Sequence, residues 1–227
     1  MTSQRVVTAL HPAADGVSRD DRKARTRRAL LDAALELTSR DRGYSGLSLR
    51  EIAKAAGVVP AAFYRHFEST EELGLTLVEE SFVTIRRTMR EVREVPVPTR
   101  HLIGVSVDAF LGYVLEHELH FRFIMKERYG GSATLRTAIR QEVRLFTSEL
   151  ATDLARAPKL SHVSTADLQL VAALVVQTVI SATELTLDTR PEDTAELDRI
   201  AADAQAQLLI IFIGGERWNG RNGDLPD

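Results

Sequence analysis

Three arginines are spaced so that they could bind phosphate groups. Arg136, Arg140 and Arg144 follow one another at intervals of four residues, which places them on one face of a helix. A guanidinium group presents a planar fork of N–H donors that matches the oxygens of a phosphate. The alternative is a solvated row of charges paired with Glu142 or with a neighbouring helix, and the sequence leaves both interpretations open.

A second group of side chains could bind a metal ion. His117 and His120 lie three residues apart, and together with Glu116 they could begin a metal site. The same residues are typical of the exposed end of a helix, which is the interpretation we favour. We therefore predict no metal site and no cofactor.

Patterns of catalytic residues are missing from the sequence. The chain has no cysteine, which excludes disulfides, thiolate metal ligands and cysteine nucleophiles. It contains no phosphate-binding glycine loop, no nucleophile elbow and no zinc-protease signature. We predict a protein that is not an enzyme.

Charge is distributed unevenly along the 227 residues. The net formal charge is −3, but residues 1–67 hold 12 basic residues against 7 acidic ones, and the rest of the chain is acidic. This asymmetry favours a nucleic-acid contact confined to the N-terminus, although chance clustering of solvated charges gives the same pattern. Residues 1–20 do not resemble a secretory signal, and the most apolar stretch, 170–182, is too short to cross a bilayer. We expect a cytoplasmic protein without membrane contact.

The elements that position these residues are predicted from apolar spacing and capping. A first helix is expected to begin near residue 19, with Leu30 and Ala34 on its buried face, and Gly43 could provide a left-handed cap after its end. Ser48 and Glu51 have the spacing of a capping box for a second helix, which a glycine ends.

A third short helix is expected to begin at Pro60, whose missing N–H costs little in a first turn, and to run to residue 67. Ser69 and Glu72 repeat the capping box and open a long helix to about residue 95. Further helices are expected at residues 99–117, 119–129, 132–157, 163–188 and 192–213. Because the sequence shows no strand pattern and no internal repeat, it predicts an all-α protein.

Two short helices that follow an amphipathic helix and are joined by a turn at residues 57–59 form a helix-turn-helix unit. Such a unit inserts its last helix into the major groove of DNA, with the N-terminal residues toward the base edges. The expected segments are a disordered tail (1–18), a helix-turn-helix DNA-binding domain (19–68), a ligand-binding and dimerisation domain (69–213) and a C-terminal tail (214–227).

The residues of the N-terminal unit resemble the TetR family of transcriptional regulators. The resemblance is carried by segments 47–53, 56–58, 63–67 and 72–73, and the length and the all-helical remainder agree with it. It implies a regulator, most commonly a repressor, that binds a double-stranded DNA operator of palindromic sequence. It also implies a small effector molecule that changes the affinity for DNA. A pure interaction module would not need the basic first helix together with Tyr64 and His66.

The same resemblance implies roles for individual positions. The DNA-contacting residues that it indicates are Arg25, Arg28, Ser48, Arg50, Ala61, Ala62, Tyr64, Arg65 and His66. Small side chains at 61 and 62 permit close approach to the groove and can touch thymine methyl groups. Tyr64 and His66 would bond phosphates, although Tyr64 could also be structural. The resemblance also implies that the basic run of the first helix (Arg22, Lys23, Arg25, Arg27 and Arg28) grips the DNA backbone, although Arg25 and Arg28 could be ordinary solvated charges. Thr70 stands where many members carry a lysine, which removes one phosphate contact.

A closer resemblance is to the FabR/DesT branch, which controls fatty-acid desaturation and senses long-chain acyl-coenzyme A (acyl-CoA). It is carried by segments 48–51, 63–67, 72–76, 121–123 and 127–128. It implies that the effector is a long-chain acyl-CoA and that the regulated genes serve fatty-acid or lipid biosynthesis. The alternative is a drug- or metabolite-responsive repressor of an efflux or catabolic operon.

An acyl chain requires a long apolar tunnel, and a thioester-linked nucleotide requires cations at its mouth. The apolar candidates for the lining are Phe82, Ile85, Phe110, Tyr113, Val114, Phe123, Phe146, Val175 and Val179. Each of them could instead be a core residue. Arg136, Arg140 and Arg144 would then bind the phosphates of coenzyme A.

The last two expected helices are predicted to form a homodimer. Leu168, Val171, Val175 and Val179 share one face of the first of them, and residues 208–213 are apolar all round. A dimer would pair two recognition helices on the two half-sites of a palindrome.

Overall fold

The computed structural model describes residues 18–39, 42–93 and 99–220. Within these ranges every regular element is helical, which confirms the all-α prediction. The elements are, in chain order, α1 (Arg19–Ser39), η1 (Tyr44–Gly46), α2 (Leu49–Ala55), α3 (Pro60–Phe63), α4 (Thr70–Arg93), α5 (Thr99–Glu116), α6 (Glu118–Glu127), α7 (Ala133–Leu154), η2 (Pro158–Leu160), α8 (Thr165–Asp188) and α9 (Thr194–Glu216). The tail predictions for residues 1–17 and 221–227 lie outside the described residues.

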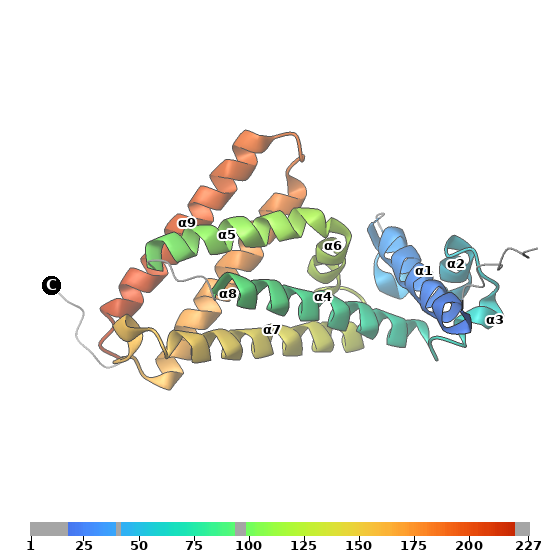
Figure 1. The fold of residues 1–227 in the computed structure, drawn as a ribbon, viewed down its shortest axis with the longest axis horizontal. Helices are drawn as coiled ribbons and strands as arrows, with labels where there is room; N and C mark the ends of the chain where they lie inside the picture. The colour runs from blue at the N-terminus through green and yellow to red at the C-terminus, as the bar shows by residue number, and fades with distance from the viewer. Residues whose placement is uncertain (1–17, 40–41, 94–98, 221–227) are drawn as a thin grey trace, which may run out of the picture.

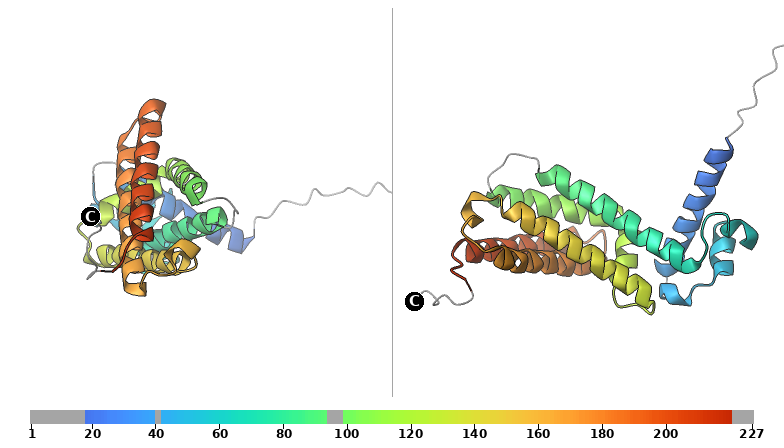
Figure 2. Two further views of the ribbon diagram at one scale, coloured as in Figure 1. Left: turned by 90° about the vertical axis from the view of Figure 1, so that its left-hand side faces the viewer. Right: turned by 90° about the horizontal axis from the view of Figure 1, so that it is seen from below.

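The chain forms a small N-terminal unit, α1 to α3, at one end of a larger helical bundle, α4 to α9 (Figure 1). Helix α4 extends from the small unit into the bundle, where it packs on α5 and α7. Helices α8 and α9 pack on each other and on α5, and η2 contacts α9. Figure 2 shows the small unit at one end of the molecule, where α1 packs on α6 of the bundle.

Local chemistry explains the helix-turn-helix. The Ser48 hydroxyl accepts a hydrogen bond from the Glu51 N–H, and the Glu51 carboxylate accepts one from the Ser48 N–H, which completes the predicted capping box. Gly57 has φ +69, a left-handed conformation that suits glycine because it has no Cβ, and it ends α2 as predicted. Ala53 is fully buried, and its small side chain lets α2 pack closely in the core.

Several boundaries differ from the sequence-based prediction: α7, for example, ends at Leu154 rather than at residue 157. Gly43 does not form a left-handed cap, because it is extended at φ −68 and begins η1. Helix α3 ends at Phe63, and the chain continues to Phe67 as a turn, closed by a hydrogen bond of 3.1 Å from Phe67 N to Phe63 O. Helix α9 continues to Glu216, past the expected end at residue 213, because the small Gly215 packs against η2 and α8.

Helix α8 is longer than the apolar stretch 170–182 suggests, and by length and composition alone it could cross a membrane. Half of its most apolar segment is buried inside the protein, between α5, α7 and α9. Length and composition are therefore weak evidence for a membrane span, since the central helix of a bundle has the same properties.

Candidate nucleic-acid interface and apolar cavity

Helix α3 is anchored by one face and exposed on the other. Phe63 and Phe67 are buried in the core, with their ring centroids 5.7 Å apart. Tyr64 is 64% exposed, Arg65 lies next to it on the surface, and Ala61 is exposed at the start of the helix. This is the arrangement that a recognition helix needs, because the side chains that would reach a groove point away from the core.

The start of α2 also faces outward. Ser48 and Arg50 are exposed. The Ser48 hydroxyl donates to the Glu51 carboxylate over 2.7 Å, so a phosphate bond from this hydroxyl requires that its proton turn away from Glu51. Hydrogen bonds from the Ser48 N–H and hydroxyl, and then from Arg42, lower the pKa of Glu51 to about 2. Glu51 therefore stays ionised and keeps the N-terminus of α2 capped.

His66 lies at the edge of this surface among cations. Its Nδ1 is buried and has no hydrogen-bond partner within the described ranges. Burial, followed by the charges of Lys23, Arg27 and Arg65, lowers its pKa from the ordinary value of 6.5. At neutral pH the imidazole is therefore uncharged, and it can serve a phosphate as a hydrogen-bond donor while the three neighbours supply the positive charge.

The basic residues of α1 divide between two faces. Arg27 covers the ring of Phe67 at 4.5 Å, and together with Lys23 it lies near His66. Arg28, for which a DNA contact is predicted, instead forms ion pairs with Asp32 at 2.7 Å and Glu80 at 3.1 Å, toward the bundle. The guanidinium of Arg28 is thus held by two carboxylates, whereas Lys23 and Arg27, which belong to the same basic run of the first helix, lie beside His66. Arg25 is exposed.

Tyr44 in η1 joins the small unit to the bundle. Its hydroxyl donates to the Thr70 carbonyl over 2.5 Å, and its ring meets Phe123 edge-on, with centroids 5.6 Å apart. Gly74 on α4 leaves room for this ring, because a Cβ there would lie 2.8 Å from the Tyr44 Cε1. Burial, and then the charge of Glu127, raise the pKa of the Tyr44 phenol, so it remains a neutral donor.

Three consecutive residues at the end of α6 each contact a different part of the molecule. Lys126 donates to the Thr38 carbonyl at the end of α1 over 3.2 Å. The fully buried Glu127 accepts a bond of 2.8 Å from the Tyr44 N–H. Arg128 borders a cavity in the bundle and pairs with Glu184 on α8 at 3.5 Å.

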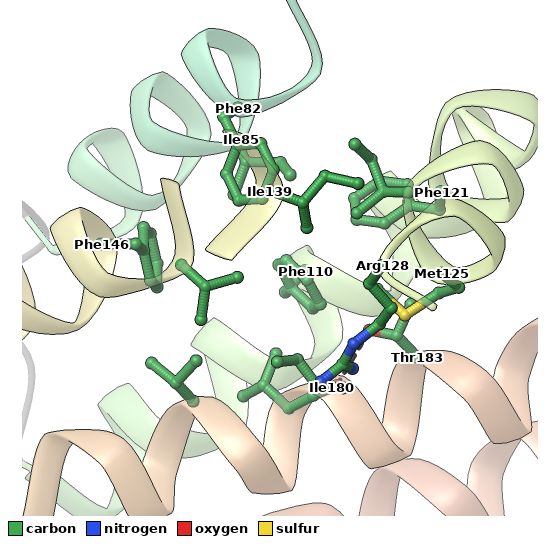
Figure 3. Close-up of a pocket in the computed structure, with 14 residues that line it drawn as sticks. Phe82, Ile85, Phe110, Phe121, Met125, Arg128, Ile139, Phe146, Ile180 and Thr183 are labelled. Atoms are coloured by element: carbon green, nitrogen blue, oxygen red, sulfur yellow. Dashed lines mark hydrogen bonds between the residues drawn. The ribbon is translucent and has the colours of Figure 1, made fainter. Parts of the chain in front are cut away.

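This cavity, which has a volume of about 70 Å³, lies between α4, α5, α6, α7 and α8 (Figure 3). Its lining is almost entirely hydrocarbon, and Arg128 and Thr183 are the polar residues on it. Five residues predicted to line an effector site border it: Phe82, Ile85, Phe110, Phe146 and Val179. The sequence-based selection lacks Phe121, Ile124, Met125, Arg128, Ile139, Val143, Val176, Ile180 and Thr183.

The other four apolar candidates lie elsewhere. Tyr113 packs against His117 with the ring centroids 4.3 Å apart, and Phe123 packs on Tyr44. Val114 is fully buried in the core, and Val175 is buried without bordering the cavity. Part of the lining could have been predicted from the sequence. Ile139, Val143 and Phe146 have the spacing of one apolar face of a helix, which places them together on α7.

The arginine row on α7 does not border the cavity. Arg136 donates to the Gly130 carbonyl in the turn before α7, and Arg140 donates to the Thr137 hydroxyl over 3.2 Å. Arg144 is exposed. Glu142, the expected partner of the row, pairs instead with Arg86 on α4. The proposed phosphate contacts of these three arginines therefore have no counterpart at the cavity.

The histidines at the start of α6 pack as aromatic rings. His117 precedes α6 and packs against Tyr113 with its ring tilted by 45°, and the ring centroids of His117 and His120 are 6.2 Å apart. In the described ranges no three His, Asp or Glu side chains are grouped so that they could hold a metal ion.

Helices α8 and α9 expose large apolar side chains, but not those that the sequence suggests for α8. Leu168, Val171 and Val175 are buried within the protomer, and Val179 borders the cavity. The large apolar residues that the two helices expose are Leu170, Leu174, Leu185, Ile210 and Ile213, whose side chains are between 44% and 69% accessible. The residues that the sequence suggests for a dimer face on α8 are therefore covered within the protomer, and the exposed apolar residues of α8 include Leu170 and Leu174.

Solved structures share this architecture. A transcriptional regulator from Rhodococcus sp. Rha1 matches with a TM-score of 0.64 at 19% identity, over 85% of this chain and 96% of that chain. AibR, in complex with isovaleryl coenzyme A and operator DNA, matches with 0.62 at 19% identity, over 81% and 97%. The fatty acid degradation regulator FadR from Bacillus halodurans matches with 0.61 at 16% identity, over 88% and 97%.

Two segments of the sequence match known protein families. Residues 30–75 match the bacterial regulatory proteins of the tetR family. Residues 99–213, half of the chain, match the tetracyclin repressor-like C-terminal domain. The helix-turn-helix and the helical bundle behind it are the two parts that these descriptions name, and the chain belongs to the TetR family of bacterial transcriptional regulators.

Proposed function

We propose that this TetR-type regulator is a homodimeric repressor that binds a palindromic operator and whose affinity for DNA is set by a long-chain acyl-CoA. The regulated genes would serve fatty-acid or lipid biosynthesis, as in the FabR/DesT branch. The observation that carries the proposal is the connection between two sites: α6 borders the apolar cavity with Arg128 and holds the DNA-binding unit with Lys126 and Glu127.

The chemistry of the cavity supports an acyl effector. Its lining offers a hydrocarbon chain a surface from which water is excluded, and burial of apolar area is favourable at about 25 cal/mol per Å². Among the structural neighbours, AibR binds isovaleryl coenzyme A and FadR regulates fatty acid degradation. Both are similar to this chain in fold, and they make an acyl thioester the first effector to test.

The volume of the cavity indicates how such an effector would act. Ligand sites commonly measure roughly 300–1,000 Å³, whereas this cavity measures about 70 Å³. A long acyl chain therefore fits only if the lining helices separate. Since an effector shifts an equilibrium only by its differential affinity for two conformers, a chain that fits only the expanded conformer would be an efficient switch.

A second candidate effector is a compact hydrophobic drug or metabolite. The observation that favours it is the same small volume, together with the absence of the arginine row from the cavity. In that case the protein would regulate an efflux or catabolic operon.

The test is titration of the complex between the protein and an operator selected from genomic fragments. Palmitoyl-CoA and oleoyl-CoA should change operator affinity by roughly 5- to 150-fold, the usual range of coupling between two sites. Free coenzyme A should leave it unchanged. Unchanged affinity at saturating acyl-CoA would exclude this effector, and a response to a planar aromatic drug instead would support the second candidate. No preference for operator over scrambled DNA would exclude the regulator itself.

A further inference from the structure

A polar groove adjoins the apolar cavity on the side of the DNA-binding unit. It measures about 300 Å³, and the residues that line it are Thr38, Arg122, Met125, Lys126, Glu184, Leu187 and Asp188. They come from the end of α1, from α6 and from the end of α8. The groove is therefore bounded by both parts of the molecule.

The groove and the cavity are neighbours separated by few atoms. Met125 borders both of them. On α8, Thr183 borders the cavity and the next residue, Glu184, borders the groove. The ion pair between Arg128 and Glu184, at 3.5 Å, connects the two linings. Rotation of the flexible Met125 side chain and opening of this ion pair would join the two spaces.

We propose that the groove between α6 and α8 is the headgroup subsite of the effector, where Arg122 and Lys126 bind the phosphorylated pantetheine arm of an acyl-CoA whose chain enters the cavity. The inference rests on the proposed function and replaces the α7 arginine row as the phosphate site. The ammonium of Lys126 and the guanidinium of Arg122 are the cations of the lining. The carboxylates of Glu184 and Asp188 can accept hydrogen bonds from the amide N–H groups of the arm.

The groups that now hold the two cations show what the headgroup would displace. Arg122 donates to the Glu118 carboxylate over 2.6 Å and to the Leu187 carbonyl. Lys126 donates to the Thr38 carbonyl. A phosphate would compete with that carbonyl for Lys126, because a charged acceptor makes the stronger hydrogen bond. Headgroup binding would thus loosen the contact between α6 and the end of α1 directly.

The experiment compares two double variants by calorimetric titration with palmitoyl-CoA. R122Q/K126Q removes the cations of the groove, and R140Q/R144Q removes two cations of the α7 row as a matched control. The groove variant should bind palmitoyl-CoA about tenfold more weakly or worse, and the control should stay within about twofold of the unmodified protein.

Two further measurements keep the test independent of folding defects. N-phenyl-1-naphthylamine, an apolar fluorescent probe without a headgroup, should bind the groove variant as it binds the unmodified protein. Asp188→Asn removes a negative charge from the groove and should tighten palmitoyl-CoA binding. Equal affinities of the groove and control variants, with palmitoyl-CoA still bound, would overturn the subsite alone. No binding of palmitoyl-CoA to the unmodified protein would overturn both the subsite and the proposed effector.

Discussion

Glu127 is fully buried, and only one of its carboxylate oxygens has a hydrogen-bond partner among the described residues. A buried polar atom without a partner costs about 1–3 kcal/mol, and more when it is charged. The oxygen that has a partner holds the Tyr44 backbone N–H at 2.8 Å. Gly130 is part of the arrangement, because a Cβ at this position would clash with the second oxygen at 2.2 Å.

At the scale of single residues, His120 makes stability depend on pH. Burial, then the charges of Arg28 and His117, lower its pKa from 6.5, and Asp32 opposes them weakly. Below pH 6.5 the unfolded chain takes up a proton that the folded chain resists, so the free energy of unfolding should fall as pH falls from about 7 to about 5. His120→Gln should flatten this decline in urea unfolding series. The exposed His162 provides the control, and a His162→Gln slope equal to that of His120→Gln would contradict the prediction.

The two arginines Arg65 and Arg28 should differ in their effect on DNA binding. Arg65→Ala should weaken operator binding by about 1–3 kcal/mol, and a lost phosphate contact should reduce the slope against salt by about 1. Arg28→Ala should leave that slope unchanged, because Asp32 and Glu80 hold its guanidinium. Fluorescence anisotropy over a series of salt concentrations measures both. A larger loss of operator affinity and of salt slope in Arg28→Ala than in Arg65→Ala would show that Arg28 faces the DNA.

At the scale of elements, η1 is the joint between the two parts of the molecule. Its tyrosine reaches between α4 and α6, and its Ser45 lies so close to the turn before α7 that a Cβ at Gly131 would be 2.4 Å from the Ser45 hydroxyl. Through η1, the small unit therefore contacts α4, α6 and the turn before α7.

Two glycine-to-alanine changes test this joint. Gly74→Ala places a methyl group 2.8 Å from the Tyr44 ring, and overpacking of this kind should destabilise the protein by about 1–3 kcal/mol. Gly112→Ala, in α5, meets nothing within 4 Å and should stabilise by about 0.5–1 kcal/mol, because alanine restricts the unfolded chain. Urea unfolding measures both changes. Equal stabilisation by the two variants would mean that the tyrosine is not held at Gly74.

Local and tertiary features differ in how well the sequence predicts them. The capping box at Ser48 and the turn at Gly57 are predicted correctly, because both depend on residues within one helical turn. The ion-pair partners of Arg28 and the position of Arg136 are not predicted correctly, because they depend on which helix packs against the one that carries them. Helical spacing separates the faces of α8, but it does not indicate which face packs on the core. The sequence analysis therefore assigns to a dimer the face that the protomer itself buries.

At the scale of the whole molecule, the exposed apolar stripe on α8 and α9 is the surface best suited to a second protomer. Side chains such as Leu174 and Ile210, 56% and 69% accessible, are costly to leave in water when they are grouped. Helices α8 and α9 pack directly on each other, and an interface that uses both would cover Leu174 and Ile210 together.

The double variant L174D/I210D should therefore be monomeric in light scattering, and it should bind operator DNA with the affinity of a single half-site. Leu145→Asp, at an exposed leucine of α7, is the control and should remain dimeric. A dimer that persists in the double variant would place the interface on another surface.

The three consecutive contacts of Lys126, Glu127 and Arg128 constrain the length of α6. Successive residues of an α-helix point about 100° apart, which is why neighbours in the chain can face α1, η1 and α8 in turn. Insertion or deletion of one residue between 118 and 125 would rotate the whole set by that angle. The carboxylate would then be turned away from η1 and the guanidinium away from the cavity, even though every residue type was kept. Relatives that vary in length should therefore carry their insertions in the connections between helices and keep the phase of α6.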